Sequence, residues 1–458
     1  MVLKKQIFRR ITYNRTYFSM KFIWRLLKNS VSLPPNLLTT TMLQTLRFSF
    51  LSLLALLSCD YALAGEFRSN GIFYKTISAD KVEVVDAVSL STPWDVTIPE
   101  TVTNEGMTYK VVGISRYACD GNHSIKSVTI PNSVTTIGES AFMGCENLES
   151  INIPNSVTSI GNEAFRLCKN MKTASIGNGI KDFGACLFMK CENLTSVTIA
   201  EGATIIGDAC FDDCFELVSV SIPSSVETIG QYAFYDCKKL ASIDLPASLT
   251  TIGICAFYGC VTAPSIAIPS QVCSIGRYAF AFCHNVTSIT VAPGNQTYNS
   301  HNNCNAIIET ATDKLIVGCR TTTVPDGVKT IGHSAFYGCT YLSSLTLPNS
   351  VTSVENQAFA NCLLMSAITV ENVTPPSTYA DAFVNLKATL YVPYSSKPVY
   401  KEADGWKLLK KIEEIQPSGI ANIENSASMT SLFDMNGRQL AKPKRGINIV
   451  NGKKILMK

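Results

Sequence analysis

The chain has 458 residues, of which 46% are hydrophobic and 16% are charged, a composition that excludes an intrinsically disordered protein. The formal net charge of +4 comes from basic ends, because residues 65–425 carry 23 Lys or Arg against 33 Asp or Glu, a net charge of −10. This acidic body argues against nucleic acid as a partner, since phosphate binding needs clustered Lys and Arg.

The first recognisable element is an export signal. After Met42, one basic residue is followed by an apolar run over 48–57 and by the small residues of Ala62-Leu63-Ala64. This order predicts a secretory signal peptide at 42–64 with cleavage after Ala64. The apolar run is too short to span a bilayer.

Two further expectations concern this end of the chain. Residues 1–41 contain no acidic residue and no apolar run of spanning length, so we expect them to be a non-native extension upstream of the start at Met42. The sequence Leu56-Leu57-Ser58-Cys59 resembles a lipobox, and lipid attachment at Cys59 is the alternative to cleavage after Ala64. No transmembrane span is expected in the mature chain.

A phenylalanine recurs every 23 residues from Phe142 to Phe280, and a cysteine follows each one three residues later. The same pair returns after an interruption. A period in this range predicts a solenoid, in which each repeat forms one coil and stacking buries a continuous core. The expected structural ladder consists of Phe142, Phe165, Phe188, Phe211, Phe234, Phe257, Phe280, Phe336, Phe359, Cys145, Cys168, Cys191, Cys214, Cys237, Cys260, Cys283, Cys339 and Cys362.

One repeat contains one clear strand pattern. Residues Ser150–Ile153 alternate between polar and apolar, which predicts a short strand. Pro154 ends that strand because proline cannot donate to a strand ladder, and Ile160-Gly161 marks a turn. Stacked coils place such strands in a parallel ladder about 4.8 Å apart. The predicted fold is therefore a mostly β repeat solenoid with short helical or irregular back segments.

The repeat pattern LxSVTIPNSVTxIGxxAFxxCxxL resembles the BspA-like, or Treponema pallidum-type, leucine-rich repeat. The resemblance implies a solenoid at 115–390, an N-terminal β cap at 65–114 and a C-terminal cap at 391–416. It also implies a hairpin insertion at 291–325. For function, it implies adhesion to host matrix proteins or to other cells.

The cysteine column is expected to be a row of buried thiols, since free cysteine is small and apolar. Neighbouring coils would hold equivalent atoms about 4.8 Å apart, whereas a disulfide needs Cβ atoms about 3.8 Å apart. Cys304 and Cys319 flank the insertion and are the candidate disulfide pair. The four histidines are scattered and no Cys-x-x-Cys occurs, so neither a metal site nor a cofactor is expected. No catalytic motif is present, which predicts that the protein is not an enzyme.

The outward strand positions of the repeats form a stripe of small polar residues. One interpretation is that Ser and Thr keep a solvent-facing sheet soluble. The other is a flat contact surface for a protein or glycan, although the stripe lacks the Trp, Tyr and Arg typical of hot spots. The candidate binding face consists of Thr129, Asn152, Ser175, Thr198, Ser221, Asp244, Thr290, Thr346 and Thr369.

Residues 417–458 are expected to form a linker and a sorting-type β tail. The pairs Asn436-Gly437 and Asn451-Gly452 predict hairpin turns. The tail resembles the C-terminal sorting domain of type IX secretion, although Asn448 stands where that family usually has Tyr. The resemblance implies export through the outer membrane of a Gram-negative cell.

These features favour a non-enzymatic secreted or cell-surface protein that mediates adhesion or protein–protein interaction. The expected ligand is an extracellular protein or glycan. A structural envelope or coat scaffold without a specific ligand is one alternative, and an accessory glycan-binding protein is another.

Overall fold

The computed structural model describes residues 65–87 and 93–416, and the backbone of three short strands in the C-terminal tail. The expected signal peptide at 42–64, the lipid-attachment alternative at Cys59 and the extension at 1–41 lie outside the described residues. In the described part of the chain, no helix is long and apolar enough to cross a membrane.

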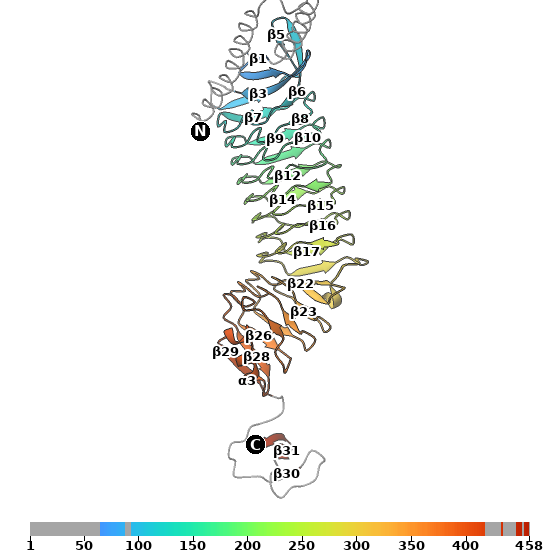
Figure 1. Ribbon diagram of the computed structural model, residues 1–458, viewed down its shortest axis with the longest axis vertical. Coiled ribbons are helices and arrows are strands. Elements are labelled where there is room, and N and C mark those ends of the chain that lie inside the picture. The colour runs from blue at the N-terminus through green and yellow to red at the C-terminus, as the bar shows by residue number, and fades with distance from the viewer. Residues whose placement is uncertain (1–64, 88–92, 417–431, 434–445, 451–452, 458) are drawn as a thin grey trace, which may run out of the picture. The chain divides into compact units, whose positions relative to one another are not determined.

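Two parallel strand ladders hold successive coils together (Figure 1). Each typical repeat gives one strand to a main ladder and a two-residue strand to a second ladder. The main-ladder strands are β7 Ile125–Thr129, β9 Ser150–Ile153, β11 Thr173–Ile176, β12 Ser196–Ile199, β14 Ser219–Ser221, β17 Ser265–Ile268, β19 Ser288–Val291, β24 Ser344–Leu347 and β26 Ala367–Val370. The second-ladder strands are β8 Thr136–Ile137, β10 Ser159–Ile160, β13 Ile205–Ile206, β15 Thr228–Ile229, β16 Thr251–Ile252, β18 Ser274–Ile275, β23 Thr330–Ile331, β25 Ser353–Val354 and β27 Ser377–Thr378.

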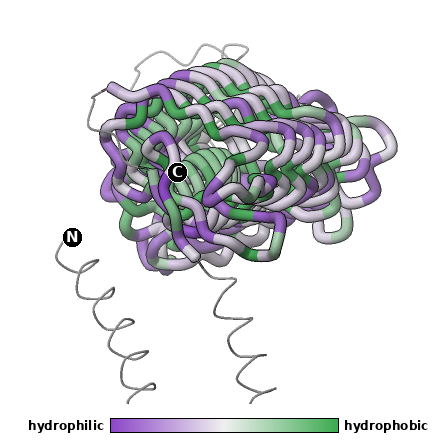
Figure 2. Tube along the Cα trace, turned by 90° about the horizontal axis from the view of Figure 1, so that it is seen from above, coloured by the Kyte–Doolittle hydropathy of each residue, from purple (hydrophilic) through white to green (hydrophobic). Residues whose placement is uncertain are grey.

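The register of the main ladder advances by one repeat for each strand. Ala174 of β11 lies opposite Ile151 of β9 and Val197 of β12. Exposed and buried residues alternate along β9, so Ile151 and Ile153 point inward. Viewed along the stack in Figure 2, hydrophobic positions gather inside the coils. The fold is a β-solenoid with a repeat of 23 residues, as the sequence predicts.

The interior of each coil is closed by a column of phenylalanine rings. The rings are buried, and neighbouring rings stack with centroids between 5.1 Å (Phe234 and Phe257) and 5.8 Å (Phe359 and Phe383) apart. Each buried ring contributes about 1.5–3 kcal/mol relative to an exposed one. Because each ring packs on the coils before and after it, one coil cannot form this core alone.

Within residues 65–87 and 93–114, six strands precede the repeats and extend both ladders. β6 pairs in parallel with β8 and so begins the second ladder. β4 pairs in parallel with β7 and forms the first edge of the main ladder. These strands are β1 Glu66–Ser69, β2 Ile72–Thr76, β3 Lys81–Ala87, β4 Trp94–Thr97, β5 Thr101–Asn104 and β6 Met107–Ile114.

A hairpin interrupts the repeats inside the expected insertion. It consists of β21 Ala306–Glu309 and β22 Lys314–Gly318, which pair antiparallel. β22 then pairs in parallel with β23, so the hairpin joins the second ladder. The preceding β20 Tyr298–Asn299 and the 3-10 turn η1 His301–Asn303 lead into it.

The last coil is covered by a short cap. It contains β28 Thr389–Pro393, the helix α3 Lys397–Glu402, the 3-10 turn η2 Trp406–Leu408 and β29 Lys411–Ile415. β29 pairs with β28 and takes the final edge of the main ladder. Trp406 is fully buried, and its indole N–H donates a hydrogen bond to the carbonyl oxygen of Pro376 over 2.7 Å.

The tail contains a small antiparallel sheet of three strands. These strands are β30 Leu432–Phe433, β31 Gly446–Val450 and β32 Lys453–Met457. β31 and β32 flank the predicted turn at Asn451-Gly452 and pair with each other. The two turn residues, and the other predicted turn at Asn436-Gly437, lie outside the described residues.

Candidate binding face

The first part of the candidate face is a stripe on adjacent strands. Asn152, Ser175 and Thr198 occupy equivalent register positions on β9, β11 and β12. Ser221 of β14 lies opposite Thr198, and Thr129 ends the neighbouring strand β7. All five side chains are exposed. They form an uncharged row of hydrogen-bonding groups with a spacing of about 4.8 Å.

Asp244 interrupts the stripe. Residues 241–246 form no strand, so the main ladder stops at β14 and resumes at β17. The Ser242 hydroxyl donates a hydrogen bond to Oδ2 of Asp244 over 2.6 Å. Aspartate is also disfavoured in strands. Asp244 therefore divides the candidate face into separate sections.

The later face residues lie in two shorter sections. Thr290 is exposed on β19, opposite Ala267 of β17. Thr346 is exposed on β24, opposite Thr369 of β26. Thr369 is half-buried, and its other neighbour in the ladder is Tyr391 of β28. The stripe from Thr129 to Ser221 is thus the longest continuous section of the candidate face.

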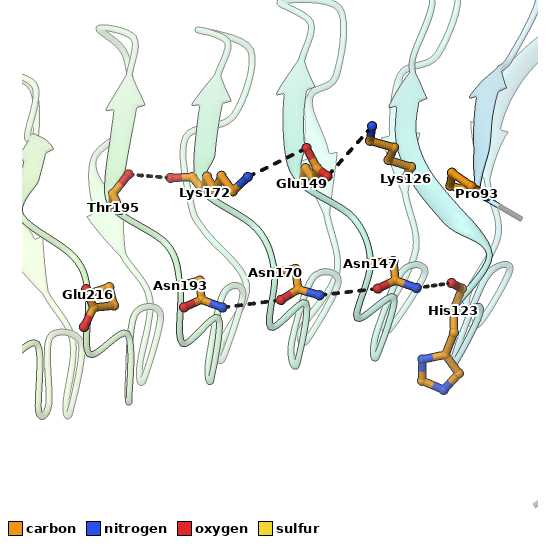
Figure 3. Close-up of a pocket in the computed structure, with 10 residues that line it drawn as sticks. All are labelled: Pro93, His123, Lys126, Asn147, Glu149, Asn170, Lys172, Asn193, Thr195 and Glu216. Atoms are coloured by element: carbon orange, nitrogen blue, oxygen red, sulfur yellow. Dashed lines mark hydrogen bonds and ion pairs between the residues drawn. The ribbon is translucent and has the colours of Figure 1, made fainter.

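A polar groove borders this long section at the N-terminal ends of its strands (Figure 3). The side-chain amide of Asn170 donates to Oδ1 of Asn147 over 3.3 Å, and that of Asn193 donates to Oδ1 of Asn170 over 3.4 Å. Each amide has two N–H donors and uses one in this row, so one remains for a ligand. The groove has a volume of about 750 Å³ and is lined by Pro93, His123, Lys126, Asn147, Glu149, Asn170, Lys172, Asn193, Thr195 and Glu216.

A row of opposite charges runs along the same groove. The carboxylate of Glu149 lies 3.9 Å from the ammonium of Lys126 and 3.9 Å from that of Lys172. Exposed ion pairs of this kind contribute at most about 1 kcal/mol, so a ligand can replace them at little cost. The groove offers donors and acceptors suited to a peptide backbone or to sugar hydroxyls. Sequence reasoning missed it, although asparagine recurs every 23 residues at 147, 170 and 193.

The cysteine column is internal and serves the backbone. Eight ladder thiols donate hydrogen bonds of 3.0–3.3 Å to a carbonyl oxygen of the preceding coil. Burial raises the pKa of Cys145 to about 12 and that of Cys362 to about 12. A thiol with such a pKa is not a nucleophile at neutral pH.

The sequence also places Cys283 beside His284. The Cys283 thiol donates to the carbonyl oxygen of Phe257 over 3.2 Å, and burial raises its pKa to about 12. Burial also lowers the pKa of His284, which favours the neutral imidazole. This arrangement does not form the thiolate–imidazolium pair of a cysteine nucleophile.

Cys304 and Cys319 are free thiols in the structure, so the predicted disulfide is not formed. Sγ of Cys304 lies 3.7 Å from Oγ of Ser300. Sγ of Cys319 lies 3.5 Å from the carbonyl oxygen of Asn305 and 3.3 Å from Oγ1 of Thr321. Each sulfur thus has local polar partners in place of the other sulfur.

Across residues 65–87 and 93–416, no three or more His, Cys, Asp or Glu side chains are arranged to hold a metal ion.

The sequence matches the BspA type leucine-rich repeat region, in six copies, over residues 112–220, 204–313 and 316–427. The chain belongs to this family. Its BspA-type repeats cover more than half of the chain and coincide with the stacked coils described above. Leucine-rich repeats typically form non-catalytic scaffolds that bind other proteins.

Several solved structures resemble this BspA-type repeat protein. A leucine-rich cell surface protein of Faecalibacterium prausnitzii shares 24% identity over 77% of this chain and 96% of its own, with a TM-score of 0.50. A leucine-rich repeat protein of Bacteroides ovatus shares 25% identity over 76% of this chain and 100% of its own, with a TM-score of 0.47. The T. pallidum leucine-rich repeat protein shares 27% identity over 44% of this chain and 91% of its own, with a TM-score of 0.39. The likeness to the first of these shows the fold alone. No curated protein matches the chain in sequence.

Proposed function

We propose that this protein is a non-enzymatic adhesion protein of the cell surface or extracellular space. The main support for this proposal is the exposed, in-register stripe from Thr129 to Ser221 with a polar groove along its edge. A solenoid presents such repeated groups over a long surface, on which many small contacts add up. The ligand is an extracellular protein or a glycan that lies across several coils.

We infer binding without catalysis from the state of the thiols. Burial raises the pKa of Cys145, Cys283 and Cys362 to about 12 in each case. Such groups stay protonated at neutral pH and act as hydrogen-bond donors to the backbone. The chemistry offered to solvent by the face and groove is hydrogen bonding and weak ion pairing.

We infer export from the two ends of the sequence. The segment 42–64 has the order of a signal peptide, with Cys59 as an alternative site of lipid attachment. The tail at 417–458 resembles a sorting domain, and its strands β30, β31 and β32 are antiparallel. The mass of the mature N-terminus tests for cleavage after Ala64. Lipid labelling of the parent and of a Cys59→Ser variant tests for lipidation at Cys59. A mature protein that keeps residues 42–64 without lipid contradicts both.

A binding screen tests the proposed function. The purified protein is applied to immobilised matrix proteins, whole bacterial cells and a glycan array. A face variant carries Thr198→Lys and Ser221→Lys, and a matched control carries Ser159→Lys and Ser274→Lys on the second ladder. Saturable binding that is lost in the folded face variant and kept in the control supports adhesion through the face.

The other outcomes separate the alternatives. Binding that survives in the face variant but is lost on Asn170→Ala moves the site into the groove. Binding confined to glycans favours an accessory glycan-binding protein. Self-association without binding to any of these ligands contradicts adhesion and leaves a structural coat.

A further inference from the structure

Aromatic side chains form a continuous row on the turns that follow the second ladder. We call this row the aromatic ridge, and it comprises Tyr232, Tyr235, Tyr258, Phe282 and Tyr337. The rings of Tyr235 and Tyr258 stack with centroids 4.6 Å apart, and Tyr232 lies 5.7 Å from Tyr235. Phe282 lies 5.1 Å from Tyr258 and 5.4 Å from Tyr337. The ridge therefore crosses the hairpin insertion, which separates Phe282 from Tyr337 in sequence.

The ridge is open to solvent and chemically suited to binding. Tyr232 is 42% exposed, and Tyr235, Tyr258 and Tyr337 are half-buried. Within the described residues, the hydroxyl groups of Tyr235, Tyr258 and Tyr337 have no hydrogen-bond partner and are not sealed from solvent. Tyrosine combines an apolar ring with a polar tip and is enriched in interface hot spots. The hydroxyl stripe of the main ladder has no such anchors.

A half-buried carboxylate lies at one end of the ridge. Asp212 occupies the same position of the 23-residue repeat as Tyr235, one coil earlier. Burial raises the pKa of Asp212 to about 6, and the neighbouring carboxylates of Asp213 and Asp236 act in the same direction. Asp213 and Asp236 have lysine partners at 3.9 Å and 3.6 Å. Asp212 forms no ion pair within 4.0 Å of a described residue, although Lys190 and Arg166 lie near enough to oppose the rise of its pKa.

We propose that the aromatic ridge and Asp212 form a second docking surface, which binds an arginine-bearing protein segment. A guanidinium group can stack on a tyrosine ring and donate two hydrogen bonds to one carboxylate. Such a group supplies the direct ion pair that Asp212 does not form within the described chain. The net charge of −10 over residues 65–425 further attracts a basic partner. This surface is separate from the hydroxyl stripe and groove of the proposed adhesion function.

A peptide titration tests this proposal on the full chain. The probe is a fluorescent peptide of repeated Arg-Gly-Ser, and a peptide of repeated Glu-Gly-Ser is the charge control. Binding is followed by fluorescence anisotropy. Asp212→Asn and Tyr232→Ser are expected to weaken binding of the arginine peptide about tenfold each. The matched controls Asp326→Asn and Tyr379→Ser change an exposed acid and an exposed tyrosine elsewhere on the chain, and should alter the affinity by less than about twofold.

Each result decides the proposal. Equal losses in Asp212→Asn and Asp326→Asn would show only general charge attraction, and overturn it. No binding of the arginine peptide also overturns it. A glycan that binds in a Tyr232-dependent and Asp212-independent way identifies a saccharide surface instead. The Thr198→Lys and Ser221→Lys variant should bind the peptide normally, so failure of the adhesion face leaves this test intact. Circular dichroism confirms that each variant is folded.

Discussion

The thiol of Cys168 donates a hydrogen bond to the carbonyl oxygen of Phe142 over 3.3 Å. The two residues belong to successive coils and to the two columns that define the repeat. The same carbonyl accepts from the backbone N–H of Cys145 over 3.2 Å, and the thiol fills its second acceptor site with little polar surface of its own. Cysteine and phenylalanine are therefore repeated for one shared reason, because both complete an interior that a single coil cannot close.

Removal of one ladder thiol should destabilise the protein. Cys214→Ala removes the 3.2 Å thiol bond to the carbonyl oxygen of Phe188, which keeps only the backbone N–H of Cys191 at 3.0 Å. We expect the free energy of unfolding to fall by about 0.5–1.5 kcal/mol in urea titrations, as for the loss of one hydrogen bond. The control Cys273→Ala changes an exposed thiol and should stay within about 0.5 kcal/mol of the parent. Equal losses in both variants would contradict the backbone role of the ladder thiols.

Removal of one ladder ring should have a larger effect. Phe188 is fully buried between Phe165 at 5.5 Å and Phe211 at 5.7 Å. Phe188→Ala should cost about 3–5 kcal/mol, whereas Tyr379→Ala at an exposed position should cost little. Hydrogen exchange should show faster opening in the adjacent coils first, because each repeat contacts only its neighbours. An even loss of protection over all coils would argue against this nearest-neighbour coupling.

The carboxyl of Asp212 should make stability depend on pH. Its pKa is about 6 in the folded state because of burial and then Asp213, against 3.8 for the free group. The folded state thus holds more protons between these values, and this group lowers stability as pH rises from about 4 to 6. Asp212→Asn should be equal to the parent at pH 4 and more stable by about 1 kcal/mol at pH 7, after allowance for solvent screening. A stability gain that is the same at both pH values would contradict this assignment.

Thiol labelling should separate surface from ladder cysteines. Cys273 is exposed, whereas the pKa of Cys145 is raised to about 12 by burial. A thiol reagent should therefore modify Cys273 in the native protein and Cys145 only after unfolding. Unfolding without a reductant should also expose Cys304 and Cys319 to the reagent, as mass spectrometry can show. Resistance of these two residues to labelling would show that they form a disulfide.

The repeat pattern was sufficient to predict the solenoid, its period and its parallel strands. The reason is that each repeat encodes a local unit, with an alternating strand such as Ser150–Ile153 and a Phe-x-x-Cys pair to fill the coil. Stacking then follows because an isolated coil leaves its apolar side chains exposed. The outward positions could be predicted for the same reason, since side chains in a strand alternate between two faces.

Only the tertiary structure decided how these positions combine into surfaces. The main ladder stops at β14 and resumes at β17, with Asp244 in the gap, and the repeat period does not reveal this break. Phe282 and Tyr337 meet at 5.4 Å because the hairpin joins the second ladder and returns the chain to the stack. Asp212 is half-buried beside Asp213 and Asp236 because of its place among neighbouring coils. The sequence determined the unit and its stacking through local packing, whereas contacts between coils determined where the surface is continuous, broken or charged.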